Sequence, residues 1–105
     1  MPEKQHYLYQ FLPADRPDLA RNPDAWTKAD NQIAADHFNY LKQALEDSIL
    51  IFAGRSLDGI GPAVVVFEAG SQKEARSFMR ADPFIKHSLF SAELHLFRAA
   101  LVREP

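Results

Sequence analysis

The chain has 105 residues, of which 47% are hydrophobic and 25% charged, and its formal net charge is −2. This size allows one domain built around a single two-layer core, so we expect residues 1–105 to form one domain. The near-neutral charge provides no basic surface for nucleic acid or for an anionic membrane. The absence of cysteine excludes disulfides, a thiolate metal site and a cysteine nucleophile. Neither a signal peptide nor a membrane span is visible, so we expect a cytoplasmic protein.

The first half of the chain predicts a strand, a loop and a long helix. Residues 6–12 alternate in the manner of a strand, with aromatic side chains at every second position. Residues 13–23 contain three prolines among charged side chains, which is typical of a loop. Thr27 and Asp30 resemble a capping box, which begins a helix that runs to about Asp47.

The second half predicts three strands and one helix. We expect the strands over residues 49–53, 63–69 and 91–101, with a hairpin connection containing glycine and proline over residues 54–62. Ser71 and Glu74 form a capping box that opens the helix. Asp82 ends this helix, because a residue that precedes proline avoids helical backbone.

The resulting order is β-α-β-β-α-β. With right-handed crossovers it gives an α+β, ferredoxin-like fold, in which two helices cover one face of a four-stranded antiparallel sheet. Residues 49–53 and 63–67 are apolar at odd and even positions alike, which indicates burial on both faces. We therefore expect a homodimer that packs sheet to sheet about a two-fold axis. The alternative is that the loop before the long helix folds back over the sheet.

Two ionisable residues occupy positions where apolar side chains are expected. His37 falls within the apolar arc of the long helix, and Asp82 continues the apolar stripe of the shorter one. The arc of the long helix comprises Ile33, Ala34, Phe38, Leu41, Ala44 and Leu45, and the stripe of the shorter helix comprises Ala75, Phe78 and Met79. Because both stripes face the core, we expect His37 and Asp82 to share one site.

An imidazole beside a carboxylate is an arrangement suited to proton transfer. His37 would donate one ring N–H to Asp82, which leaves the other ring nitrogen available as a base or an acid. The alternative is structural: Asp82 caps the turn at Pro83, and His37 bonds a backbone carbonyl. Both interpretations remain open from these residues alone.

Five short runs resemble the YciI-like (YCII-related) family. These runs are HFNYL at 37–41, IFAG at 51–54, VVFE at 65–68, EARSF at 74–78 and ADPF at 81–84. They follow the family order from about residue 6 to residue 101, and HFNYL and ADPF are the most specific. The resemblance implies a dimeric α+β barrel of two ferredoxin-like protomers and an active-site pair that corresponds to His37 and Asp82. One family relative is a dehydrochlorinase that acts on chlorinated hydroquinones. The chain departs from the family at Ala34, where many members carry arginine.

Three further side chains are candidates for contact with a substrate. Arg55 follows a glycine at the end of a strand and could hold a carboxylate, although a solvated loop arginine is the simpler interpretation. Phe84 is expected to line the pocket beside Asp82, and the alternative is that it only packs in the hydrophobic core. Tyr9 could offer its phenol to a ligand, whereas aromatic packing within a strand is the alternative. The histidines show no metal-ligand spacing, so we expect no metal and no cofactor.

These observations favour one of two functions. The first is a cofactor-free lyase or isomerase, in which His37 and Asp82 transfer a proton on a small acidic or phenolic substrate. The second is a non-catalytic dimeric module that binds a small ligand in the same pocket. RNA binding is excluded, because residues 61–68 lack the basic-glycine-aromatic pattern that an RRM requires.

Overall fold

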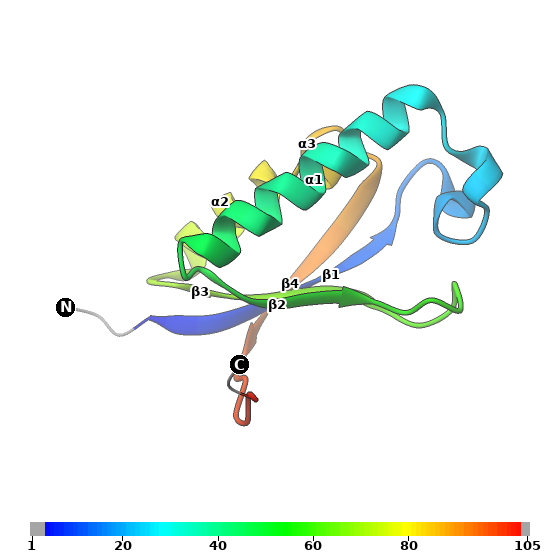
Figure 1. Cartoon of the computed structure of the whole chain (residues 1–105). Coiled ribbons are helices and arrows are strands. Elements are labelled where there is room, and N and C mark those ends of the chain that lie inside the picture. The colour runs from blue at the N-terminus through cyan, green and yellow to red at the C-terminus, as the bar shows by residue number, and fades with distance from the viewer. Residues whose placement is uncertain (1–3, 104–105) are drawn as a thin grey trace.

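The computed structural model describes residues 4–103, and within them the main elements follow the expected order. The strands are β1 (Gln5–Pro13), β2 (Leu50–Arg55), β3 (Ala63–Ala69) and β4 (Phe90–Phe97), and the helices are α1 (Lys28–Glu46), α2 (Gln72–Ala81) and the short α3 (Pro83–Lys86). Two 3-10 turns, η1 (Pro17–Ala20) and η2 (Pro23–Ala25), lie between β1 and α1. The four strands form one antiparallel sheet in the order β2-β3-β1-β4 (Figure 1). This is the ferredoxin-like arrangement.

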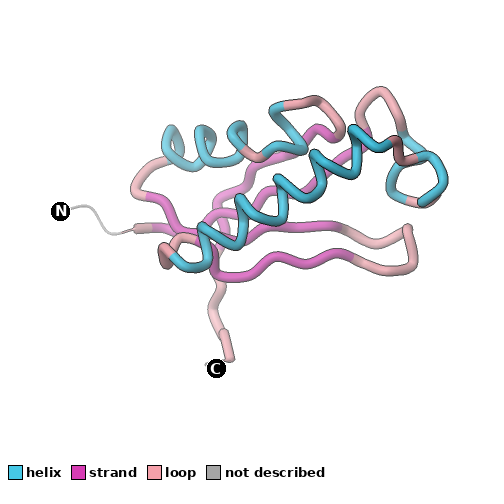
Figure 2. The backbone as a smooth tube through the Cα atoms, turned by 45° about the horizontal axis from the view of Figure 1, so that its top comes forward, coloured by secondary structure: helices cyan, strands magenta, loops and turns pink. Residues whose placement is uncertain are grey.

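The helices lie on one face of the sheet, and the core fills the space between the two layers (Figure 2). Strand β1 supplies this core with alternate aromatic residues, because side chains two positions apart share a face. Tyr9 lies opposite Val65 of β3 and opposite Leu94 of β4, so these three side chains point toward the helices. The buried cluster comprises Tyr7, Tyr9, Leu41, Val65, Phe67, Ala69, Ala75 and Met79.

The other face of the sheet carries no helix and includes several apolar side chains. Val66 is fully buried there, but Phe52 and Phe97 are 49% and 39% exposed. The segment 14–27 lies at the end of the sheet beside the start of α1, so it does not extend across this face (Figure 1). The alternative in which this loop covers the sheet is therefore wrong. The sheet-to-sheet dimer remains a prediction.

Helix α1 buries a different stripe from the one expected. Phe38 and Leu45 are 66% and 56% exposed, whereas Leu41 and Ala44 are buried. Tyr40 turns inward instead and packs against the core. The helix is thus rotated away from its strongest apolar arc, because it also carries His37 and Tyr40 toward α3 and α2.

The ends of β4 and β2 and the cap of α2 differ from the sequence prediction. Strand β4 ends at Phe97, because the N–H of Ala99 leaves the ladder and donates to Nδ1 of His6. Ser71 caps α2, but the carboxylate of Glu74 accepts from the N–H of Gly70, so the expected reciprocal box is only half formed. Strand β2 extends through Arg55. Within residues 4–103 no helix combines the length and the hydropathy needed to cross a bilayer.

Candidate functional site

Asp82 lies at the junction between α2 and α3 and is fully buried. Its backbone N–H bonds the carbonyl of Met79 at 3.2 Å, which closes α2. Its carboxylate Oδ1 accepts the N–H of Phe84 at 3.0 Å, which caps the start of α3. Pro83 suits the first position of α3, because an N–H at that position would have no partner within the helix. The sequence predicted the stop at Asp82 but not the helical turn that follows.

His37 lies on α1 and meets the same carboxylate. Its Nδ1 is 2.7 Å from Oδ1 of Asp82, and its side chain is 16% exposed. An ionised carboxylate only accepts hydrogen bonds, so Nδ1 carries the proton and Nε2 is left with its lone pair in the neutral ring. Among the described residues, every buried side-chain nitrogen has a hydrogen-bond partner. Nε2 of His37 has none there, so this atom is not buried and is accessible to solvent. The expectation that the two residues meet is confirmed.

Tyr9 occupies the remaining side of the carboxylate. Its hydroxyl donates to Oδ2 of Asp82 at 2.8 Å, and its side chain is fully buried beneath α1 and α2. Burial, followed by the adjacent Asp82 charge, raises the pKa of the Tyr9 phenol well above its usual value. The hydroxyl proton is therefore committed to Asp82, which differs from the ligand contact considered for Tyr9 from sequence. Three donors, from Tyr9, Phe84 and His37, together satisfy the buried carboxylate.

Aromatic rings surround the imidazole on its inner side. Phe84 stacks on His37, with ring centroids 4.0 Å apart and an interplanar angle of 19°. Phe11 meets the imidazole edge-on at 5.6 Å. These two ring contacts fix the orientation of the imidazole against Asp82. Phe84 thus lies where the sequence predicted, against the pair.

Tyr40 is a neighbour that the sequence pattern did not single out. Its hydroxyl donates to the carbonyl of Phe78 at 2.7 Å, which ties α1 to α2. Burial, with a smaller contribution from Asp82, raises the pKa of the Tyr40 phenol to about 12. The signal was present in the sequence as a tyrosine three residues after His37, one helical turn further along α1.

Arg55 is not brought to the pair. It is exposed at the end of edge strand β2, opposite Ala63, and among residues 4–103 no hydrogen bond or ion pair joins its side chain to the site. Two surface hollows, of about 420 and 340 Å³, also lie elsewhere, one on α2 and one where β1 and β4 meet the start of α2. Neither is lined by His37 or Asp82. The described residues contain no cluster of three histidine or acidic side chains that could hold a metal ion.

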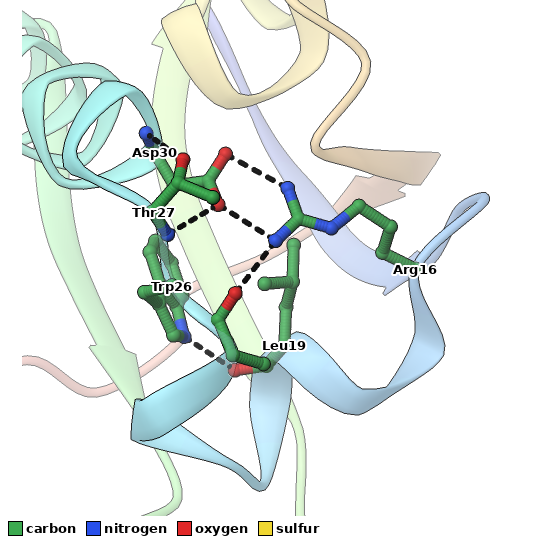
Figure 3. A network of polar contacts seen from close by, with 6 residues as sticks. Arg16, Leu19, Trp26, Thr27 and Asp30 are labelled. Carbon is green, nitrogen blue, oxygen red and sulfur yellow. Dashed lines mark hydrogen bonds and ion pairs between the residues drawn. The ribbon is translucent and has the colours of Figure 1, made fainter.

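The segment before α1 is held by a second polar network (Figure 3). Arg16 and Asp30 form a two-pronged ion pair, and the carboxylate of Asp30 also accepts the N–H of Thr27. The Thr27 hydroxyl accepts the N–H of Asp30, so the predicted capping box is confirmed. The sequence predicted the part of Asp30 in this cap, but nothing local in the sequence indicated Arg16 as its partner.

The fold and the site define a ferredoxin-like α+β domain that carries a buried aspartate and a half-buried histidine in direct contact. The YCII-related domain matches residues 8–97, and the chain belongs to this family. A comparison with curated proteins finds no match. Among solved structures, the chain is similar to a 5-chloro-2-hydroxyhydroquinone dehydrochlorinase from Burkholderia phenoliruptrix AC1100, in complex with 2,5-dihydroxybenzoquinone. The TM-score is 0.62 at 22% identity, covering 89% of this chain and 93% of that chain, so the likeness concerns the fold.

Proposed function

We propose that the chain binds a small acidic or phenolic molecule beside His37 and transfers a proton on it, as a cofactor-free lyase or isomerase. The observation that carries this proposal is the 2.7 Å contact between Nδ1 of His37 and the fully buried carboxylate of Asp82. This contact fixes the tautomer and leaves Nε2 as a base at the surface. The quinone in complex with the similar dehydrochlorinase supports the choice of substrate class.

In this proposal each residue has a separate role. Nε2 of His37 removes a proton from the substrate and later returns it. Asp82 orients the imidazole and stabilises the charge that develops on it. Phe84 stacks on the ring and helps to fix its orientation. Tyr9 holds Oδ2 of Asp82, so the carboxylate cannot rotate away from His37.

The experiment follows exchange of ring protons with deuterated solvent, because such exchange reports proton transfer without requiring knowledge of the product. The probe is 2,5-dihydroxybenzoquinone, and its C–H signals are followed by NMR with and without the protein. We expect the wild-type protein to accelerate the exchange. His37→Gln should remove about 10²–10⁴-fold of the rate, which is the usual contribution of a positioned base.

The matched control is His87→Gln, because His87 is also a histidine but lies exposed at the C-terminal end of α3, away from the open face of the sheet. It should exchange protons at the wild-type rate. Binding without exchange, unchanged in His37→Gln, would instead support the non-catalytic binding module. Equal exchange in wild type and His37→Gln would refute the proton-transfer proposal, and the absence of binding would refute the substrate class.

We also propose that a second copy of the chain covers the open face of the sheet. Phe52 on β2 and Phe97 on β4 remain about half exposed there, which leaves apolar surface in contact with water. Sedimentation equilibrium should give twice the chain mass of 11.9 kDa. Phe52→Asp should lower the association constant, because it places a charge in the interface. A mass of one chain at every concentration would refute the dimer.

A further inference from the structure

Trp26 connects the segment before α1 to the candidate site. We propose that Trp26 is a positioning residue of the His37–Asp82 pair: it acts through Phe84, and the Arg16–Asp30 ion pair sets its place. The inference deepens the proposed function, and its ligand-binding arm rests on that function. Its main test uses the ligand-free protein and stands alone.

The anchor is a charged pair whose acidic member is nearly inaccessible. The guanidinium of Arg16 bonds both carboxylate oxygens of Asp30, at 2.8 and 2.7 Å, and Asp30 is only 4% exposed (Figure 3). Such a two-pronged contact fixes orientation as well as distance. The Arg16 bond, with the backbone N–H of Thr27, holds the pKa of the Asp30 carboxyl well below its usual range. Asp30 therefore stays charged and keeps its hold on Arg16 over the whole neutral range.

The same guanidinium controls the backbone next to the tryptophan. Arg16 also donates to the carbonyl of Ala25 at 2.7 Å, directly before Trp26. The indole N–H donates to the carbonyl of Leu19 at 2.8 Å, and the Leu19 side chain is buried. The tryptophan is thus fixed at its backbone by one bond and at its ring by another, both within residues 16–30 (Figure 3).

The indole in turn packs on the rings that reach the imidazole. Its centroid lies 6.1 Å from that of Phe84 and 6.3 Å from that of Phe90. Phe84 and Phe90 contact each other edge-to-face at 5.0 Å, and Phe84 stacks on His37 at 4.0 Å. Trp26 therefore closes the outer side of the ring cluster. Without it, Phe84 could tilt away from His37, because α3 is a single short turn that begins at Pro83.

The test records the ring C–H signals of His37 by NMR in the ligand-free protein. Phe84 shields these protons while it stacks on the imidazole, so a released Phe84 moves them downfield. We expect this shift in Trp26→Leu and in Arg16→Gln. Trp26 is the only tryptophan of the chain, so its fluorescence reports the anchor alone and should move to longer wavelength in Arg16→Gln.

Arg21→Gln is the matched control. Arg21 lies in the same segment and is also exposed, but its guanidinium donates to the carbonyl of Gly59 on the β2–β3 connection. It should leave the His37 signals unchanged. Arg16→Lys keeps the positive charge but cannot bond both carboxylate oxygens of Asp30 at once. It should therefore shift the His37 signals partially, and it can be measured even where Trp26→Leu fails to fold.

Unchanged His37 signals in both Trp26→Leu and Arg16→Gln would overturn the proposal, because Phe84 would then be held without Trp26. For ligand binding, the loss of one aromatic contact should weaken the affinity for 2,5-dihydroxybenzoquinone by about 2- to 10-fold. If the wild-type protein does not bind this probe, the proposed function fails, while the NMR result still decides the positioning role of Trp26.

Discussion

Replacing Tyr9 with phenylalanine isolates the hydroxyl that holds the buried carboxylate. The change removes one oxygen and keeps the ring, which packs edge-on against Phe67 at 5.7 Å and against Phe11 at 5.5 Å. The lost bond joins the hydroxyl to Oδ2 of Asp82 at 2.8 Å. A hydrogen bond to a charged group contributes about 1.5–3 kcal/mol to the free energy of unfolding.

Tyr40→Phe is the matched control for this change. The Tyr40 hydroxyl donates to the neutral backbone carbonyl of Phe78, and such a bond contributes about 0.5–1.5 kcal/mol. We therefore expect Tyr9→Phe to lower the free energy of unfolding more than Tyr40→Phe does. The two substitutions remove the same atom from the same residue type, so the difference reports the charge on the acceptor.

The assay is urea unfolding at pH 7, with all proteins at one concentration because association would add to the apparent stability. The slope with urea should be the same in all three proteins, which confirms that the substitutions leave the fold intact. An equal or smaller effect of Tyr9→Phe would refute the reasoning. It would mean that Asp82 is not held as a charged group by Tyr9.

Three further predictions concern pH and packing. Unfolded tyrosines ionise near pH 10.0, whereas the raised pKa values of Tyr9 and Tyr40 keep these phenols protonated in the folded state, so stability should fall above pH 10. Each tyrosine lowers the free energy of unfolding by about 1.4 kcal/mol per pH unit in this range. Tyr9→Phe should therefore make the free energy of unfolding, measured by urea unfolding, decrease less steeply with pH; an unchanged slope would contradict this. The backbone N–H of Gly61, followed by other donors, lowers the pKa of the Asp58 carboxyl from 3.8 to about 2. The ionised carboxylate of Asp58 therefore contributes its full stabilisation above pH 3.8, and this contribution is lost as the pH falls toward 2. Asp58→Asn should lose this pH dependence in acid unfolding curves, and a curve parallel to wild type would count against it. Phe67→Ala, at a fully buried position, should cost about 3–5 kcal/mol in the same assay, and a cost below 1 kcal/mol would indicate a core that refills the cavity.

The meeting of His37 and Asp82 could be predicted because both positions follow local rules. Helical spacing places each on a core-facing stripe, and an ionisable side chain on such a stripe needs a polar partner. The stop at Pro83 placed Asp82 at a helix end. Spacing alone could not set the rotation of α1, which is why Phe38 and Leu45 were assigned to the core and are exposed.

Tyr9 as a second partner of Asp82, and Arg16 as the partner of Asp30, could not be predicted from the sequence. Tyr9 lies 73 residues from Asp82 in the sequence, and alternation along a strand gives the face of a side chain but not its bonding partner. Arg16 lies in a segment of 3-10 turns, where no regular spacing relates it to Asp30. Both contacts arise from tertiary packing alone.

The position of Asp82 between two helices gives one residue a part in both the architecture and the candidate site. Its backbone closes α2, and one carboxylate oxygen both starts α3 and orients the imidazole. A substitution here would disturb the path of the chain as well as the contact with His37, so inactivity of such a variant would not identify the aspartate as catalytic. His37 carries no such second duty in the helix ladder. Under the proposed function, variation at position 37 would therefore alter the chemistry while the scaffold persists, which would make α1 the element through which this domain acquires a new reaction.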